Sequence, residues 1–295
     1  MLNISLRQLQ IFVAIAREGS ASQAAETLFI SKPAVSMALS ELEKQLDQTL
    51  FLRQKNRLHL NEHGKALLPL ADELLSRSES IDKLFRQESI LTGSLKIGAS
   101  ETIGNQLIPY LIRDFRQFSG HDRQSLALGN SAGIAEMLLS FDLDIGFIEG
   151  RVEHPDLNIT PWKTDEMVIV SNPSHPLCHN GKVSWADLNS QPWILREQGS
   201  GTRDYFSQHV ASHLETWKTE FELSNTEAII NSVAAGLGLT CISRHTVTHA
   251  LADNRVVILP TPANAARQFW MVRHKQKYAS PLLENFEAYC RDWRH

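Results

Sequence analysis

Serine, threonine and asparagine residues follow several of the apolar runs in the C-terminal two thirds of the chain. Such side chains, together with unpaired backbone N–H groups at the start of a helix, can hold an anion. Arg196 ends the run PWILR and supplies a positive charge. The other candidates at equivalent positions are Ser100, Glu101, Thr102, Asn130, Ser131, Glu149, Gly201, Thr202, Asn225 and Thr226. These residue types indicate a site for a small oxyanion.

The elements that must position these residues alternate between strand and helix. The first unit is predicted to have strands in SLKIGAS, QSLALGN and DIGFIEG and helices in IGNQLIPYLIRDFRQF and SAGIAEMLLSF. After a crossover near Asp165, the second is predicted to have strands in EMVIVSN, PWILRE, FELS and LGLTCIS and helices in TRDYFSQHVASHLETW and NTEAIINSVAAG. The strand FWMVRHK and the helix SPLLENFEAYC are expected to return to the first unit.

This alternation predicts an α/β fold in which helices cover parallel sheets. Two such units joined by crossovers would leave a cleft between them. Ligands of open α/β sheets bind beyond the carboxyl ends of the strands, beside helix N-termini. The candidate residues stand at such positions, so we expect them to face the cleft. The alternative is a structural cleft that has no physiological ligand.

The first sixty residues predict three short helices and a hairpin. Apolar residues recur at helical spacing from Leu6 to Ala16, and Gly19 can end this helix in a left-handed conformation. Ser20 or Ser22 can cap the second helix. The hairpin is predicted in FLRQKNRLHL. Short helices joined by a tight turn and followed by a hairpin describe a winged helix-turn-helix.

The third helix begins in ISKPAVS, where Ser31 suits the N-cap and Pro33 the first turn. Its inward residues are Val35, Leu39, Leu42 and Leu46, and its outward residues are Lys32, Ser36, Met37 and Ser40. The N-terminal end of such a helix can enter the major groove of DNA. The hairpin residues Arg53, Lys55 and Arg57 would then contact phosphates. The alternative is an ordinary capped helix beside a solvated hairpin.

A long helix is predicted in NEHGKALLPLADELLSRSESIDKLFRQES, with Asn61 as its cap. The apolar residues Leu67, Leu70, Leu74, Ile81 and Leu84 form a heptad-like seam interrupted by Arg77. A helix of this length spans roughly 40 Å, so pairing with a second copy is the expected cover for the seam. Pro69 predicts a late start or a kink. Packing on the chain's own winged domain is the alternative.

Composition restricts the class of protein. The chain of 295 residues carries a net charge of −4, whereas its first sixty residues carry +2, an asymmetry too small to indicate nucleic-acid binding by itself. The three cysteines, Cys178, Cys241 and Cys290, match no disulfide framework, so a reducing compartment is expected. We expect no membrane span and no secretion signal, and therefore a cytoplasmic protein.

Two further patterns carry weaker chemistry. The segment GSGTR resembles a phosphate cradle, but no P-loop ending follows it and no dinucleotide fingerprint is complete. Cys241, His245 and His249 are spaced like metal ligands on one helix face. Cys241 falls in the apolar strand run LGLTCIS, so a buried thiol and two surface histidines are expected instead. No serine or cysteine has a motif that couples it to a base.

The segments LRQLQIF, AAETL, SKPAVS, LEKQL, LFLR and NEHG occur in this order within residues 5–65. In this respect the chain resembles the DNA-binding module of the LysR-type transcriptional regulators. That resemblance implies that Ser31, Lys32, Ser36 and Met37 lie near base edges and that Ser20, Ser22, Arg53 and Arg57 lie near phosphates. Many family members have glutamine at the position of Lys32 and arginine at that of Met37, so Lys32 is expected to take over part of the readout.

The resemblance extends through the whole chain and is closest to a subgroup of sulfite-responsive regulators of sulfur metabolism. ASETIGN, DIGFIEG, PWILREQGSGTR and LSNTEAI are similar to effector-site motifs of that subgroup. This implies a small anionic effector, sulfite or sulfate, with no other cofactor. Another small carboxylate or anion is the alternative. Glu101 stands where serine is frequent in the subgroup and would repel an anion unless it points away.

Together these patterns give an α/β fold class with three parts. They are an N-terminal winged helix-turn-helix DNA-binding domain (1–61), a long linker helix for dimerisation (62–90) and a two-lobed, periplasmic-binding-protein-like effector domain (91–295). Lobe I is expected at about 91–164 plus 265–295, and lobe II at about 165–264.

The implied function is DNA-binding transcriptional regulation without catalysis. A homodimer or a dimer of dimers would read a pseudo-palindromic site in double-stranded DNA. The alternative is a two-lobed small-molecule-binding protein or enzyme with an incidental helical domain.

Overall fold

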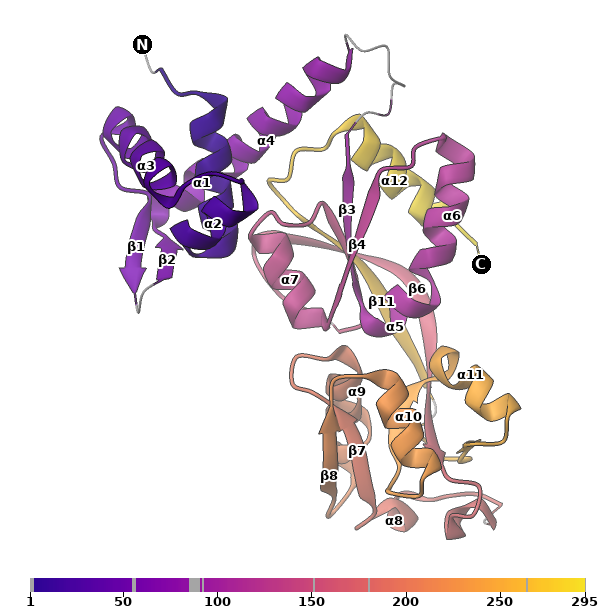
Figure 1. The fold of residues 1–295 in the computed structure, drawn as a ribbon. Coiled ribbons are helices and arrows are strands. Elements are labelled where there is room, and N and C mark those ends of the chain that lie inside the picture. Colours follow the sequence, from indigo (N-terminus) through magenta and orange to yellow (C-terminus); the bar gives the residue numbers. More distant parts are fainter. Residues whose placement is uncertain are drawn as a thin grey trace.

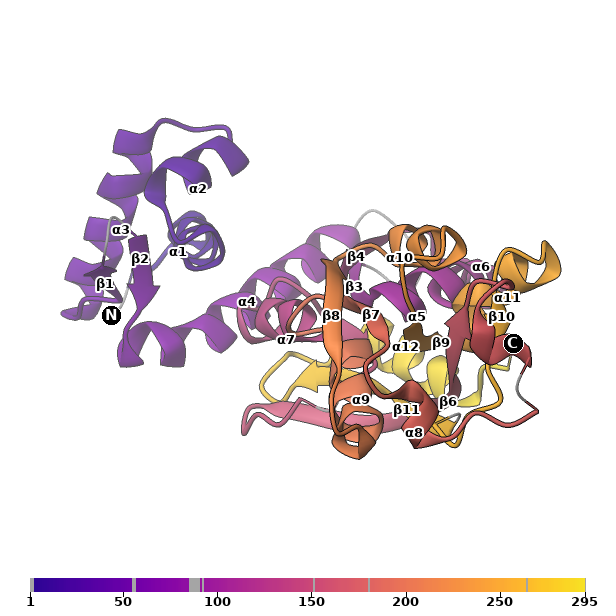
Figure 2. The same cartoon turned by 90° about the horizontal axis from the view of Figure 1, so that it is seen from below.

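The computed structural model describes residues 3–54, 57–84, 91, 93–150, 152–179, 181–263 and 265–294. A small helical domain at the N-terminus is joined by one long helix to two α/β lobes (Figure 1). Figure 2 shows that the N-terminal domain stands to one side of the lobes and that the long helix α4 lies between them.

The N-terminal domain has the predicted winged helix-turn-helix elements. They are α1 (Leu6–Glu18), α2 (Ala21–Thr27), α3 (Lys32–Leu46), β1 (Phe51–Gln54) and β2 (Arg57–Leu60), with the two strands antiparallel. Gly19 ends α1 with φ +64°, and the Ser31 hydroxyl accepts a hydrogen bond from the Ala34 N–H at the start of α3. Val35 and Leu42 of α3 are fully buried with Phe12 of α1. The helices and the hairpin of this domain therefore follow the local cap and spacing signals.

The linker helix α4 (Glu62–Leu84) begins seven residues before Pro69, so of the late start or kink predicted there, the late start is wrong. The Asn61 side chain accepts a hydrogen bond from the Gly64 N–H and caps the helix as expected. Leu68 and Ala71, on either side of the proline, are buried against the N-terminal domain. Burial of these side chains offsets the loss of one backbone hydrogen bond at the proline.

Lobe I contains the parallel strands β3 (Leu95–Ser100), β4 (Gln124–Gly129) and β5 (Ile145–Ile148), in the order β5-β3-β4. Its helices are α5 (Glu101–Gln106), α6 (Ile108–Ser119), α7 (Ser131–Leu139) and α12 (Pro281–Asp292). The single helix predicted in IGNQLIPYLIRDFRQF is two helices, separated at Leu107 (φ −119°, ψ −45°) just before the first turn of α6, which contains Pro109. Helix α12 packs in the lobe I core, as predicted for the C-terminal return.

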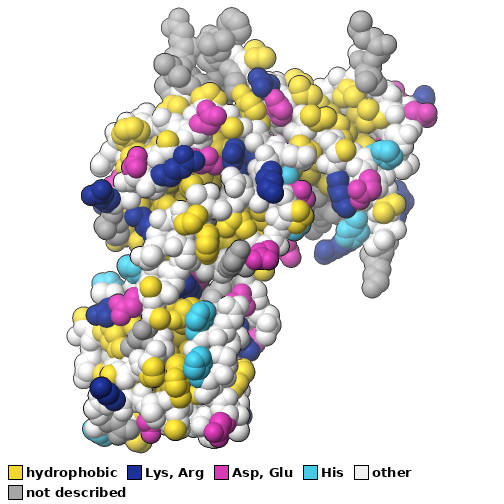
Figure 3. Space-filling model, turned by 180° about the vertical axis from the view of Figure 1, so that it is seen from behind, with side chains coloured by type: hydrophobic (Ala, Val, Ile, Leu, Met, Phe, Trp, Pro, Cys, Tyr) yellow, Lys and Arg dark blue, Asp and Glu magenta, His cyan; other side chains and the backbone are white. Residues whose placement is uncertain are grey.

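Two long strands connect the lobes. They are β6 (Leu157–Ser171) and β11 (Ala265–His274), which pair antiparallel along most of their length. The chain passes between the lobes near Asp165 as predicted, but it does so inside the continuous strand β6. The prediction of parallel sheets holds only in part: β11 also pairs antiparallel with β5, so the large sheet is mixed. Figure 1 shows these two strands passing between the lobes, and the space-filling view shows that the molecule narrows there (Figure 3).

Lobe II is built on the far halves of the crossing strands. Strands β9 (Thr240–Ser243) and β10 (Val257–Ile258) pair with β6, while β7 (Pro192–Arg196) and β8 (Lys218–Leu223) form a parallel pair. The helices are α8 (Trp185–Leu188), α9 (Gly201–His209), α10 (Thr226–Ala234) and α11 (Arg244–Ala252), with 3-10 turns at Pro176–His179 and Ala211–His213. Two apolar clusters, one around Trp193 and one around Ile229, fill this lobe.

Lobe I also supplies part of the core of the N-terminal domain. Phe141, in the turn after α7, is 2% exposed and belongs to the same apolar cluster as Phe12 and Leu68. The Arg17 guanidinium of α1 donates to the Phe141 carbonyl at 2.7 Å and lies 3.0 Å from the Asp142 carboxylate. The residues that make this contact between domains are more than 120 residues apart in sequence, and the contact was not predicted.

Candidate functional site

Six of the residues predicted to contact DNA line one surface depression of about 450 Å³ on the N-terminal domain. They are Ser20, Ser22, Lys32, Ser36, Arg53 and Arg57. The α2–α3 turn and the hairpin bring them together, so cationic side chains from three separate elements surround one hollow. Opposed cations and hydroxyls of this kind can accommodate a phosphate backbone.

Four other predicted DNA contacts are not among the residues that line this depression. Ser31 and Pro33 are exposed at the start of α3, and Met37 projects from the same helix with 73% of its surface exposed. An exposed methionine of this size is available for apolar contact. Lys55 lies outside the described residues.

The arginine predicted for anion binding is held by two carboxylates. The Arg196 side chain is 4% exposed, and its Nη1 lies 2.7 Å from Oε2 of Glu101. Its Nε and Nη2 donate to the Glu197 carboxylate at 2.8 and 3.0 Å. Burial by itself would lower the pKa of Arg196, but the bonds to Glu197 and the charge of Glu101 outweigh burial and raise the pKa. Glu101 therefore points toward the arginine and not away from the cleft.

Glu149 is the second carboxylate between the lobes, and it is 4% exposed. It accepts hydrogen bonds from the Ser100 hydroxyl and the Thr102 N–H, both at 3.1 Å, and from the Thr202 hydroxyl of lobe II at 2.9 Å. The Arg267 guanidinium lies 3.2 Å away. Burial alone would raise the pKa of Glu149, but Arg267 and the threonine donors hold the pKa below its ordinary value.

Asn130 and Ser131 connect the end of β4 to the opposite lobe and to β5. The Asn130 amide donates to Glu197 at 3.1 Å, while its oxygen caps α7 by accepting from the Gly133 N–H. The Ser131 hydroxyl accepts from the Gly150 N–H at 3.2 Å. Both residues therefore lie at the interlobe cleft, but most of their polar atoms have partners within the protein.

The remaining candidates lie on lobe II. Thr226 donates both its N–H and its hydroxyl to Glu101, at 3.0 and 2.9 Å. Gly201 packs so closely on Gly150 that a Cβ atom at position 201 would lie 2.3 Å from the Gly150 nitrogen. Asn225 uses its side-chain oxygen to cap α10. Thr226 and Gly201 thus contact lobe I residues among the predicted set, whereas the Asn225 side chain caps α10.

Two central residues were missed from sequence. Arg267 and Asp165 form a buried ion pair with an Nη2–Oδ2 distance of 2.5 Å where β11 and β6 cross. The strand predicted in FWMVRHK starts two residues after Arg267, whereas β11 starts at Ala265 and includes Arg267. The pairing of Arg267 with Asp165 depends on the register of β11 and β6, for which the sequence carries no local signal.

A cavity of about 220 Å³ opens beside this cluster. Its lining includes Glu149, Gly201, Asp204, Tyr205, Arg267 and Gln268. The cavity has room for a small molecule and contacts residues of both lobes and of the crossing strand.

The residues set aside as a metal pattern do not share one element. Cys241 lies in β9, while His245 and His249 lie in α11. Burial raises the pKa of the Cys241 thiol to about 12. Within the part of the chain that the structure describes, no group of three or more His, Cys, Asp or Glu residues is arranged to hold a metal ion.

Family models match both parts of the chain. Residues 6–65 match the bacterial regulatory helix-turn-helix protein, lysR family, and residues 89–294 match the LysR substrate binding domain. The chain belongs to the LysR family of transcriptional regulators. It is therefore a DNA-binding transcriptional regulator with an effector-binding domain and not an enzyme, and the alternative of an incidental helical domain is wrong. Members of this family bind DNA and small-molecule effectors and act as oligomers.

Relatives match over nearly the full length. The chain is 40% identical to YeiE of Escherichia coli strain K12, described as an uncharacterized HTH-type transcriptional regulator, over 98% of both chains. It is 30% identical to the HTH-type transcriptional regulator CysL of Bacillus subtilis strain 168, over 94% of this chain and 91% of CysL.

Solved structures share the fold. A full-length OxyR variant from Pseudomonas aeruginosa matches with a TM-score of 0.73 and 24% identity, over 98% of this chain and 94% of that chain. The regulatory domain of CcmR from Synechocystis PCC6803, solved in complex with 2-PG, matches with a TM-score of 0.61 and 26% identity, over 68% of this chain and 96% of that chain. Among the described helices of the present chain, none is long and apolar enough to cross a membrane.

Proposed function

We propose that the interlobe cleft senses a small anion, with a sulfur oxyanion such as sulfite as the preferred effector. The observation that carries this proposal is that donors from both lobes already surround carboxylate oxygens. Arg196 and Thr226 hold Glu101, while Thr202 and Arg267 hold Glu149. Groups that satisfy a carboxylate have the geometry and charge to satisfy another oxyanion. The CcmR domain solved with 2-PG supports a small ligand in a domain of this kind.

The proposed partners are double-stranded DNA and a second copy of the chain. The basic depression around Lys32 and Arg53 would contact the DNA, with the start of α3 in the major groove. Three seam residues of α4 are exposed to solvent: Leu70 by 58%, Leu74 by 51% and Ile81 by 60%. This apolar exposure supports pairing of α4 with a second copy in a homodimer or a dimer of dimers. Such an assembly would read a pseudo-palindromic operator in the cytoplasm.

Effector binding is proposed to act on the relative position of the two lobes. An anion can shift that equilibrium only by the difference in its affinity for the two arrangements. Because Phe141 and Arg17 fasten lobe I to the N-terminal domain, a movement of the lobes would alter the spacing of the recognition helices in the assembly.

Calorimetric titration of the full chain with sulfite, sulfate, thiosulfate and simple carboxylates tests the proposal. We expect saturable binding of one sulfur oxyanion in preference to carboxylates of similar size. If the chain prefers a carboxylate, the proposed anion site stands, but its effector is a carboxylate and not a sulfur oxyanion. Absence of binding by every anion in the series would contradict the anion sensor.

A further inference from the structure

Glu101 connects the two lobes through both of its carboxylate oxygens. It is the first residue of α5 in lobe I, yet its hydrogen-bond partners belong to lobe II. One oxygen accepts from the Thr226 N–H at 3.0 Å. The other accepts from the Thr226 hydroxyl at 2.9 Å and lies 2.7 Å from Arg196. These three donors are the ones that an anion in this cleft would use.

The surroundings of Arg196 are rich in negative charge. Glu197, on the same lobe, occupies two other guanidinium nitrogens, and Glu149 lies nearby with Arg267 as its own partner. An incoming anion at Arg196 would meet the Glu101 carboxylate at close range in a buried site. Like charges held together in such a site are strongly unfavourable, so the anion and Glu101 cannot share the same donors.

We propose that Glu101 is a built-in competitor of the effector. In the absence of ligand its carboxylate holds Arg196 and Thr226, and an effector anion binds by displacing it. Glu101 then sets the anion concentration to which the regulator responds, and it selects against weak anions that cannot replace a carboxylate at Arg196. This inference rests on the proposed anion site and adds a specificity-determining residue to it.

Substitution of Glu101 by glutamine tests the inference because glutamine keeps the size of the side chain and removes its charge. Titration of the E101Q protein with sulfite and with sulfate should give an affinity about tenfold or more above that of the unsubstituted chain, since a like charge is removed from the site. A merely structural role would have the opposite effect, because loss of an interlobe contact would weaken binding. Glu101→Ser is the second variant and carries the same expectation.

The matched control is Glu227→Gln. Glu227 lies on the first turn of α10 beside Thr226, but its side chain is 65% exposed and faces Arg255 at 3.7 Å. This control removes the same charge from the neighbourhood and should leave the affinity within about twofold, because exposed charges are screened. Equal or weaker binding by both Glu101 variants, with binding by the unsubstituted chain intact, would overturn the inference alone. If no protein in the series binds either anion, the proposed anion site fails as well.

Discussion

The ammonium group of Lys277 lies 3.0 Å from the carboxylate of Asp72 and 2.8 Å from that of Asp144, and all three side chains are largely buried. Asp72 belongs to the linker helix α4, whereas Lys277 and Asp144 belong to lobe I. Arg17 of α1 adds a further ion pair to Asp72 at 3.4 Å. Removal of one partner from a buried ion pair leaves an uncompensated charge. This network therefore ties the position of the N-terminal domain to lobe I.

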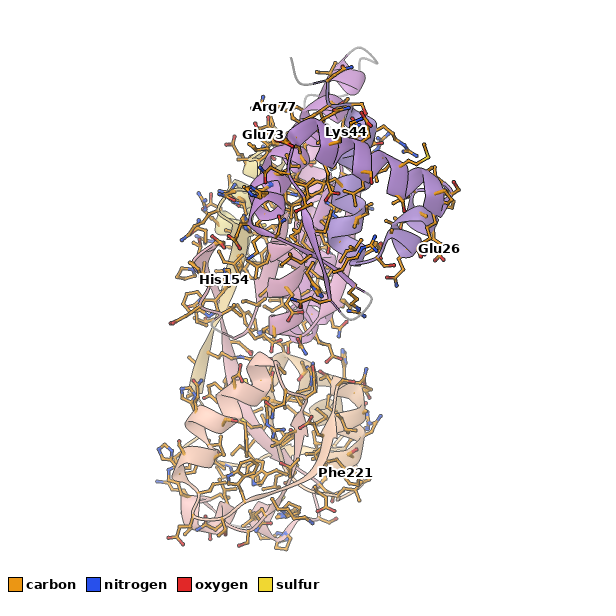
Figure 4. All side chains as sticks on the ribbon, turned by 90° about the vertical axis from the view of Figure 1, so that its left-hand side faces the viewer. Glu26, Lys44, Glu73, Arg77, His154 and Phe221 are labelled. Atoms are coloured by element: carbon orange, nitrogen blue, oxygen red, sulfur yellow. The ribbon has the colours of Figure 1, made fainter. Side chains whose placement is uncertain are left out.

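The apolar part of this connection predicts a large stability effect. Phe141→Ala should lower the free energy of unfolding by about 3–5 kcal/mol, because a buried aromatic ring is lost from a packed core. Phe221→Ala is the control: Phe221 is 43% exposed on β8 (Figure 4), and its loss should cost about 1–2 kcal/mol, because less apolar surface is removed from the core. Chemical denaturation followed by tryptophan fluorescence compares the two. Equal losses for both variants would contradict the proposed connection.

The charge on the recognition helix predicts a DNA-binding effect. Lys32→Ala should weaken binding to the operator by about 1–3 kcal/mol and should weaken binding to competitor DNA less. Lys44, at the other end of α3 (Figure 4), is exposed away from the depression, so Lys44→Ala should change operator binding little. Gel-shift titrations at two salt concentrations measure both effects. Comparable losses from the two variants would mean that the start of α3 has no special role.

The seam of the linker helix predicts a change of oligomeric state. Leu74→Glu combined with Ile81→Glu should lower the molecular mass in solution, because charges on an apolar dimer seam are unfavourable. Glu79→Gln on the same helix should preserve the mass. Light scattering after size exclusion gives the answer. A double variant that keeps the mass of the unsubstituted protein would place the oligomer contact elsewhere.

Acid should weaken the contact between the lobes. The pKa of Glu149 is lower in the folded protein than in an unfolded chain, where it is about 4.3, so its contribution to stability is full above that value. The contribution is lost as pH falls through the folded pKa, because the unfolded state then binds more protons. The stability difference between the unsubstituted protein and Glu149→Gln should therefore shrink below about pH 4. Thermal midpoints between pH 3 and 7 measure it, and a difference that grows on acidification would contradict the ion-pair arrangement.

The sequence predicted the elements and positions that depend on local signals. Ser31, Asn61 and Gly19 act as caps within a few residues of themselves, so their roles follow from spacing. The polar residues after the strands also gather at one cleft, because strand ends of parallel sheets meet at one edge.

Long-range pairing could not be predicted in the same way. The partners Asp165 and Arg267 are 102 residues apart, and their meeting depends on the register of two crossing strands. The insertion of Phe141 into the N-terminal core likewise depends on packing between domains. The role of Glu101 was open in the sequence because the direction of one side chain decides whether it opposes or occupies an arginine.

Arg196 is proposed to form an anion site between the lobes. This site is tested by calorimetric titration with sulfite of the unsubstituted chain and of the Arg196→Ala variant. The Arg244→Ala variant, which removes an exposed ion pair, is the control. We predict saturable binding to one site per chain in the unsubstituted protein and in the Arg244 variant. Arg196→Ala should lose at least about two powers of ten in affinity, because a buried charge-assisted contact is removed. Unchanged sulfite affinity in the Arg196 variant would contradict the account.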